Sequence, residues 1–141
     1  MAEPKRPAIA YVGDGAWGMS FGELLTCVRE DIPVTAVVFN NEQWGAEKKN
    51  QVDFYANRFE GVNLKNPGWA DVAKTLGAEG VVVKNLGDVG EALEKAIDAQ
   101  KRGKTTVLEM LVTKELGDPF RRDALKKPKR LLKKYEHTNV A

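Results

Sequence analysis

The stretch that most constrains the fold of this chain is residues 13–43. It opens with Gly13-Asp14-Gly15, continues through apolar residues at helical spacing, and then enters the apolar run of residues 34–39. The polar sequence Asn40-Asn41-Glu42-Gln43 follows directly. This order predicts a strand that ends at a glycine turn, a helix, a second strand and a polar loop. Two strands joined through a helix are expected to be parallel, with a right-handed crossover.

The glycine turn and the polar loop are expected at the same edge of the sheet, because parallel strands end together. That carboxyl edge, beside a helix N-terminus, is where open α/β sheets bind ligands. Asp14 offers an anionic oxygen and Asn41 a neutral carbonyl oxygen, a pair that suits Mg²⁺ bridging to phosphate. A plainer interpretation stays open, in which the glycines only form a tight turn, Asp14 caps the helix and Asn41 lies in a turn.

The remaining apolar patterns predict a sheet whose strands alternate with helices. Strands are expected at residues 7–12, 34–39, 80–84 and 105–113, and the continuous first run predicts burial on both faces. Helices are expected at residues 17–30, 69–76 and from Val89 to near Gly103. Residues 42–64 show no clear period and predict a long, aromatic-containing loop. The fold class is therefore α/β, a doubly wound parallel sheet with helices on both faces.

Composition excludes several other classes of protein. The 141 residues carry a formal net charge of only +2, which gives no support to a general nucleic-acid role. Cys27 is the only cysteine, so no internal disulfide can form and a reducing compartment fits. No apolar run is long enough to span a bilayer and no signal-peptide pattern opens the chain. We therefore expect a cytoplasmic protein.

Gly13-Asp14-Gly15 and Asn40-Asn41, with 27 positions from Asp14 to Asn41, together resemble the metal–diphosphate motif of thiamine diphosphate enzymes. The resemblance implies thiamine diphosphate and Mg²⁺ as cofactors. It implies that Asp14, Asn41 and the backbone carbonyl of Gln43 ligate the metal. The implied cofactor-binding residues are Gly13, Asp14, Gly15, Ala16, Trp17, Asn41, Gln43, Trp44 and Gly45. For Trp17, a core position on the helix is an equally good interpretation.

Longer blocks resemble one group within that family, the sulfoacetaldehyde acetyltransferases. These blocks are residues 13–20, 43–55 and 115–125. The resemblance implies cleavage of sulfoacetaldehyde with phosphate to give acetyl phosphate and sulfite. Two alternatives stay open: the small subunit of a split enzyme like sulfopyruvate decarboxylase, and a cofactor-binding module without turnover.

The chain departs from the family pattern in what precedes its motif. Only 12 residues come before Gly13, where the family has an earlier strand–helix unit, so one sheet edge is expected to be bare. The resemblance also implies that the glutamate that activates the cofactor belongs to the pyrimidine-binding domain of a partner chain. No catalytic residue is therefore assigned here, and the chain alone is expected to be inactive and to work in a homo- or hetero-oligomer.

We expect two segments: a diphosphate- and Mg²⁺-binding α/β domain at residues 1–113 and a basic tail at residues 114–141 that packs on the domain or on a partner. Four cationic side chains could contact an anionic substrate, lie on a solvated basic surface or form a salt bridge between subunits: Lys48, Lys49, Arg121 and Arg122. His137 is expected on the surface, and Cys27 is expected to be a small buried apolar side chain.

Overall fold

The computed structural model describes residues 6–117 and residue 133. Four parallel strands form one sheet in the order β1-β2-β4-β3. The strands are β1 (Ile9–Gly13), β2 (Thr35–Asn40), β3 (Glu79–Val83) and β4 (Thr106–Leu111). The helices are α1 (Asp14–Ser20), α2 (Glu23–Arg29), α3 (Gly45–Phe54), α4 (Trp69–Thr75), the 3₁₀ helix η1 (Leu86–Asp88) and α5 (Val89–Lys101).

The described chain divides into two units. The first unit comprises residues 1–42 and 65–113, and the second comprises residues 43–64 and 114–141, each within the described ranges. The whole sheet and helices α1, α2, α4 and α5 belong to the first unit, whereas α3 belongs to the second.

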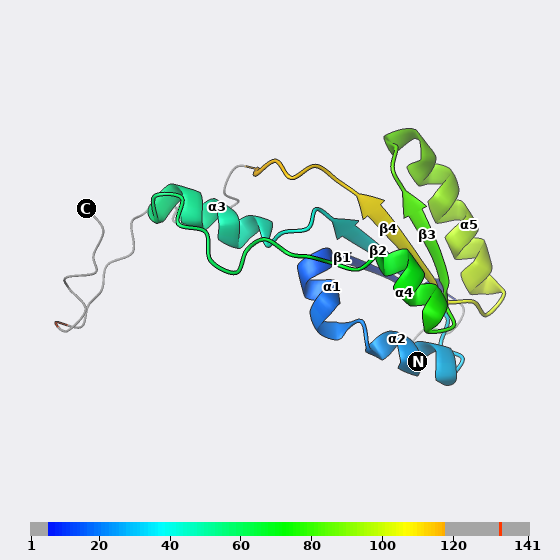
Figure 1. Cartoon of the computed structure of the whole chain (residues 1–141). Coiled ribbons are helices and arrows are strands. Elements are labelled where there is room, and N and C mark those ends of the chain that lie inside the picture. Colours follow the sequence, from blue (N-terminus) through cyan, green and yellow to red (C-terminus); the bar gives the residue numbers. More distant parts are fainter. Residues whose placement is uncertain (1–5, 118–132, 134–141) are drawn as a thin grey trace. The chain divides into compact units, whose positions relative to one another are not determined.

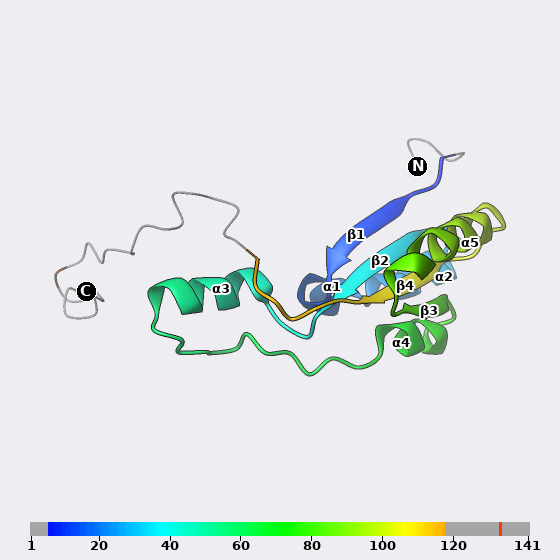
Figure 2. The same ribbon diagram turned by 90° about the horizontal axis from the view of Figure 1, so that it is seen from above.

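Helices cover both faces of the sheet, as the alternation of strands and helices predicted. On one face, Leu24 of α2 and Trp69 and Ala73 of α4 pack with the buried strand residues Ala36, Val38 and Val107. On the other face, Ala96 of α5 packs with Val37, Val83, Leu108 and Met110. Figures 1 and 2 show α4 and α5 on opposite sides of β3 and β4. Because neighbouring strand residues point to opposite faces, the central strands β2 and β4 are largely apolar, and Glu109 is the one charged residue in them.

The first strand differs from its prediction. It was expected to be buried on both faces, but Tyr11 is 79% exposed and Ile9 is 49% exposed. The physical reason is its place in the sheet: β1 pairs only with β2 among the described residues and is an outer strand. An apolar run predicts a strand, but the position of that strand in the sheet decides whether both of its faces are covered.

The expected single helix over residues 17–30 is two short helices. Between them, Leu24 N–H donates to Phe21 O and Leu25 N–H donates to Gly22 O, so the bonding tightens to an i to i+3 pattern at this point. Glycine has a low helix propensity, and Gly22 lies at the break. The apolar face nevertheless continues, since Phe21 and Leu24 both pack on the same core cluster.

The second unit contains a helix that the sequence analysis did not predict. Residues 42–64 were expected to form a loop, but Gly45–Phe54 is helical. None of the ten residues of α3 is fully buried, so the helix has no apolar stripe for a periodicity argument to detect. Local bonds close the segment: Trp44 N–H donates to Val62 O, and the Gln51 side chain bonds to both backbone groups of Glu60.

Helix α4 lies unusually close to β3. A Cβ atom placed on Gly80 would be 1.9 Å from the carbonyl oxygen of Ala70. Only glycine permits this approach, which places the N-terminal turn of α4 against the second residue of β3. Gly77, which follows α4 with a φ of +90°, lets the chain turn from the helix into β3.

Candidate cofactor site at the carboxyl edge of the sheet

The carboxyl edge of the sheet brings the glycine turn and the polar loop together. Gly13, the last residue of β1, is the register partner of Phe39 in β2. Asp14 therefore follows β1 where Asn40 ends β2, and Asn41 follows next. Helix α1 begins at Asp14, so the first turn of a helix lies at this edge. The arrangement expected from the chain order is confirmed within the first unit.

Asp14 is buried, with only 2% of its surface exposed. Its Oδ2 accepts a hydrogen bond from Nδ2 of Asn66 at 2.5 Å. Gly13 occupies the N-cap position of α1, and no side-chain hydrogen bond caps that helix. The alternative that Asp14 serves as a helix cap is therefore wrong, and the burial of this carboxylate needs another explanation.

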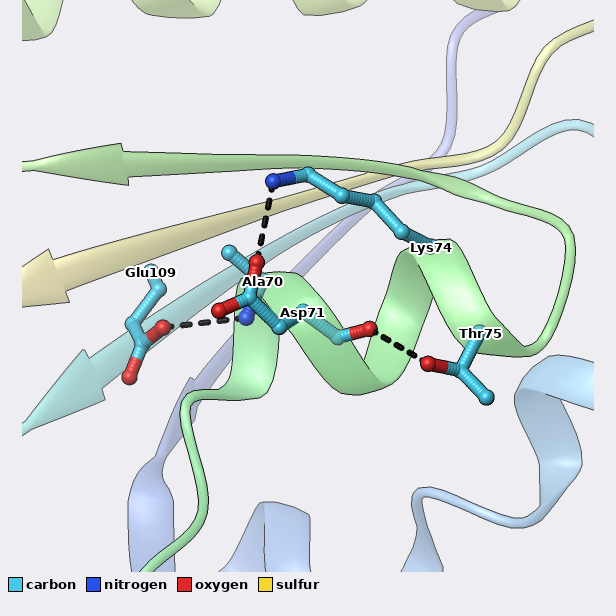
Figure 3. A network of polar contacts seen from close by, with 5 residues as sticks. All are labelled: Ala70, Asp71, Lys74, Thr75 and Glu109. Atoms are coloured by element: carbon cyan, nitrogen blue, oxygen red, sulfur yellow. Dashed lines mark hydrogen bonds and ion pairs between the residues drawn. The ribbon is translucent and has the colours of Figure 1, made fainter.

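A network of hydrogen bonds extends from Asp14 into the core. Asn66 Nδ2 also lies 3.3 Å from Oδ1 of Asn40, which accepts the backbone N–H of Glu42 as well. Asn40 Nδ2 donates to Oε1 of Glu109 at 2.7 Å. Oε2 of Glu109 accepts the N–H of Ala70 at 2.9 Å, in the first turn of α4 (Figure 3). We call the residues Asp14, Asn40, Asn66, Ala70 and Glu109 the carboxyl-edge network.

The electrostatics of this edge favour a cation. Asp14 and Glu109 are each 2% exposed, and neither forms an ion pair with a lysine or arginine within the described ranges. Buried carboxylates are usually paired with a cation or bound to a metal. Residues 6–117 and 133 contain no group of three or more His, Cys, Asp or Glu side chains placed to hold a metal ion together, so any metal here needs amide or carbonyl oxygens beside Asp14. Mg²⁺ accepts such a set, completed by phosphate and water.

Gly13 leaves room where a ligand would approach. Its φ of −76° and ψ of 155° are ordinary extended values, so the backbone does not require glycine. A Cβ atom built on it would meet nothing within 4 Å. Neither conformation nor packing within the described residues requires glycine here, and the backbone at this position has open space beside it.

The other candidates of the first unit have distinct surroundings. Gly15 is buried and Ala16 is half-buried, both in the first turn of α1. The ring of Trp17 packs against the core cluster that contains Leu24 and Trp69, so this side chain is part of the hydrophobic core. Asn41 is half-buried directly after β2. Of the predicted residues, backbone groups of α1 and the oxygens of Asp14 and Asn41 remain suited to a diphosphate–metal group.

Gln43, Trp44 and Gly45 belong to the second unit. Gln43 is 3% exposed, and its side chain donates to Lys114 O and accepts from Lys48 Nζ at 3.0 Å. Lys48 also donates to Asn63 Oδ1. The side chain of Gln43 is thus committed to structure, which leaves the predicted role to its backbone carbonyl. Trp44 and Gly45 are half-buried at the start of α3.

The remaining candidates divide into three cases. Lys49 pairs with Asp53 on α3. Arg121, Arg122 and His137 lie outside the described residues, as does most of the predicted tail. Cys27 is half-buried rather than buried, and burial together with the nearby Glu23 raises the pKa of its thiol, so it is a poor nucleophile.

Sequence reasoning missed Asn66 and Glu109. Asn66 was interpreted as part of the turn Asn66-Pro67-Gly68, and its distance of 52 positions from Asp14 gave no hint of contact. Glu109 did leave a signal: it is a lone charge inside the apolar fourth strand. A carboxylate in a strand buried on both faces requires partners, and that conflict could have identified it.

The fold and the edge site define an α/β domain built to hold a phosphate-bearing cofactor. The sequence matches the family described as "Thiamine pyrophosphate enzyme, C-terminal TPP binding domain" over residues 1–110. The chain therefore belongs to the thiamine diphosphate-binding domains of this enzyme family. The cofactor of the family is thiamine diphosphate, and its enzymes use Mg²⁺ with it.

Relatives with curated names agree with the narrower resemblance. The chain is 65% identical to the sulfoacetaldehyde acetyltransferases of Castellaniella defragrans and Alcaligenes xylosoxydans xylosoxydans, over 96% of its own length and 23% of theirs. It is 45% identical to that of Rhodobacter capsulatus, over 91% of this chain and 22% of the relative. The chain thus spans about a quarter of the length of these relatives.

A solved structure shows the same fold. Benzoylformate decarboxylase from Polynucleobacter necessarius matches with a TM-score of 0.74 and 27% identity, over 82% of this chain and 21% of that chain. The predicted α/β class with a parallel sheet is confirmed. No helix in the described part of the chain is long and apolar enough to cross a membrane.

Proposed function

We propose that this chain is the thiamine diphosphate- and Mg²⁺-binding part of an enzyme that cleaves sulfoacetaldehyde with phosphate to acetyl phosphate and sulfite. The observation that carries the cofactor role is the buried carboxylate of Asp14 in the first turn of α1, which forms no ion pair with a lysine or arginine within residues 6–117 and 133. The substrate class rests on the 65% identity to sulfoacetaldehyde acetyltransferases over nearly the whole chain. We further propose that it acts in the cytoplasm, which suits its single cysteine.

The residues of this chain would bind and orient the cofactor. Asp14 Oδ1 or Oδ2, the side-chain oxygen of Asn41 and the backbone carbonyl of Gln43 would ligate Mg²⁺, which neutralises the diphosphate. Backbone N–H groups of Gly15, Ala16 and Trp17 would bind phosphate oxygens, with Trp44 and Gly45 completing the cofactor-binding set. The thiazolium ring of the bound cofactor supplies the carbon nucleophile of the reaction.

The proposed assembly needs a second protein component. We assign no catalytic residue to this chain and propose that a pyrimidine-binding domain or subunit supplies the activating glutamate, within a homo- or hetero-oligomer. The chain by itself would then bind cofactor without turnover. The acyltransfer and its carbon–carbon cleavage step would appear only in the assembly.

Calorimetric titration of thiamine diphosphate into the purified chain tests the cofactor role. We expect saturable binding with Mg²⁺ that EDTA abolishes. Asp14→Asn should lose this binding, because it removes the anionic ligand with little change of shape. Asp98→Asn is the matched control, since Asp98 forms an exposed pair with Lys101 on α5, and it should bind like the wild type.

Activity is tested by sulfite release. The chain alone should release none, and addition of the preceding domains of a 65% identical relative should restore it. Sulfite release by the chain alone would refute the need for a partner. If neither the chain nor the assembly binds cofactor in an EDTA-sensitive way, the proposed function is wrong.

A further inference from the structure

We infer that Glu109 is a positioning residue that sets the orientation of Asp14 through the side-chain amides of Asn40 and Asn66. The metal-binding consequence of this inference rests on the proposed function, whereas the orientation itself does not. Glu109 lies on β4, in the middle of the sheet, and reaches Asp14 only through the two intervening amides.

The order of donors and acceptors in the network is fixed first at Ala70. The Ala70 N–H can only donate, so Oε2 of Glu109 must accept it. Figure 3 shows this bond between the strand and the first turn of α4. The Glu109 carboxylate presents a second acceptor, Oε1, to Asn40, and the Asn40 amide must therefore turn its NH₂ group toward β4. Glu109 is 2% exposed, so water has little access to substitute for either bond.

The same order of donors and acceptors continues from Asn40 through Asn66 to Asp14. With its NH₂ group on Glu109, Asn40 directs Oδ1 the other way, where it accepts from Glu42 N–H at 3.1 Å and Asn66 Nδ2 at 3.3 Å. Asn66 in turn places its NH₂ group on Oδ2 of Asp14. Each amide has one orientation that satisfies both neighbours, and a carboxylate at each end of the network requires that orientation.

Replacing one oxygen of Glu109 by an NH₂ group breaks this scheme without removing volume. In Glu109→Gln, an amide that still accepts from Asn40 turns its own NH₂ toward Ala70 N–H, so two donors face each other. An amide that accepts from Ala70 instead forces Asn40 to turn over. Asn40 then presents NH₂ to both Glu42 N–H and Asn66 Nδ2. Either arrangement leaves buried donors without an acceptor, and this costs free energy even though glutamine has nearly the same shape as glutamate.

The test compares Glu109→Gln with Gln100→Glu, the reverse exchange at a second buried site. Gln100 is 6% exposed, donates to Ala8 O and Pro33 O, and accepts from Thr35. These partners lie before or at the start of β1 and β2, at the opposite edge of the sheet. Both variants disturb a buried amide or carboxylate, and only one of them belongs to the carboxyl-edge network.

The first readout is the set of side-chain NH₂ signals of Asn40 and Asn66 in ¹⁵N-resolved NMR of the full chain, without cofactor. Glu109→Gln should shift both pairs of signals, and Gln100→Glu should leave them in place. Unchanged Asn66 signals in a folded Glu109→Gln protein would overturn the inference. If that variant does not fold, Asn66→Ala replaces it: the Asn40 signals should then shift, and an unshifted Asn40 would be equally decisive against the network.

The second readout is Mg²⁺-dependent binding of thiamine diphosphate. Loss of a residue that orients a metal ligand weakens metal binding about 10- to 100-fold, and we expect that loss in Glu109→Gln but not in Gln100→Glu. Wild-type affinity together with shifted Asn66 signals would overturn the connection between Glu109 and the metal. Absence of binding in the wild type would refute the proposed function instead, and the NMR comparison would still decide the orientation of the network.

Discussion

At the scale of single residues, a substitution at Gly13 should affect cofactor binding more than the stability of the fold. Its backbone angles suit any residue, and a Cβ atom there would meet nothing within 4 Å. Gly13→Ala should therefore change the free energy of unfolding by no more than about 1 kcal/mol, the scale of an altered helix cap. The added methyl group should instead weaken cofactor binding, because it occupies the space that the diphosphate needs.

Chemical denaturation and calorimetric titration of the same Gly13→Ala protein check this expectation. Gly87→Ala is a suitable control, since a Cβ atom there also meets nothing within 4 Å and Gly87 lies in η1, away from the carboxyl-edge network. Equal cofactor affinity in the Gly13→Ala protein and the wild type would show that the diphosphate does not approach this backbone.

Spacing along the chain predicted that Asp14 and Asn41 lie at one edge of the sheet, which the structure confirms, and their role as metal ligands stays a prediction. Asp14 and Asn41 were found because each follows a strand, and parallel strands end at one edge. Asn66 and Glu109 were not found, because their contacts connect positions 52 and 69 residues apart. A hydrogen bond between distant positions has no periodicity, and only the packed fold shows it.

At the scale of elements, α4 and β3 approach each other closely at Gly80. Gly80→Ala would place its Cβ atom 1.9 Å from Ala70 O, and a backbone oxygen in a helix cannot rotate away. We expect a loss of about 3 kcal/mol or more in the free energy of unfolding. Because Ala70 also donates to Glu109, displacement of α4 should disturb the carboxyl-edge network as well.

Urea denaturation of Gly80→Ala and Gly90→Ala tests this element-scale prediction. Gly90 lies in α5 with open space at its Cβ position, so alanine there should stabilise the protein by up to about 1 kcal/mol. Both substitutions add one methyl group, which meets a backbone oxygen at Gly80 in β3 and open space at Gly90 in α5. Similar stability in both proteins would contradict the close approach of α4 to β3.

Helices α1, α2 and α3 show which kinds of helix the apolar spacing of the sequence can predict. The apolar spacing of residues 17–30 correctly indicated helix, and Gly22 divided it. Helix α3 has no buried residue and is held by local bonds such as those of Gln51 to Glu60. A helix without an apolar face leaves no hydrophobic period, so periodicity could not predict it.

At the scale of the whole molecule, cofactor binding and folding should be linked. A ligand that binds only the folded chain stabilises it by about 2.7 kcal/mol at 100 times its dissociation constant. For a chain of this size we expect the melting temperature to rise by roughly 10 °C with thiamine diphosphate and Mg²⁺. The rise should disappear with EDTA and in Asp14→Asn, because both remove the metal–carboxylate contact.

Differential scanning calorimetry with and without both ligands measures this linkage. Asp98→Asn should show the full rise, since its carboxylate is exposed on α5. An equal rise in EDTA would show that the cofactor binds without the metal, and it would remove Asp14 from the proposed set of ligands.

The exposed apolar face of β1 is also a property of the whole molecule. Ile9 and Tyr11 line a groove of about 760 Å³ with residues of β2, β4 and α5. The family pattern predicted a bare sheet edge, and β1 is an outer strand among the described residues. Its apolar composition alone had predicted full burial, which the strand order overrules.

The sequence by itself determined the α/β class, the parallel strands, the family and the identity of the candidate metal ligands. It could do so because strand–helix alternation and the spacing from Asp14 to Asn41 are local or regular features of the chain. Only the tertiary structure decided that β1 is exposed, that Gly80 contacts Ala70, and that Glu109 connects to Asp14 through two amides. These features depend on which segments pack side by side, and packing joins positions that no local pattern relates.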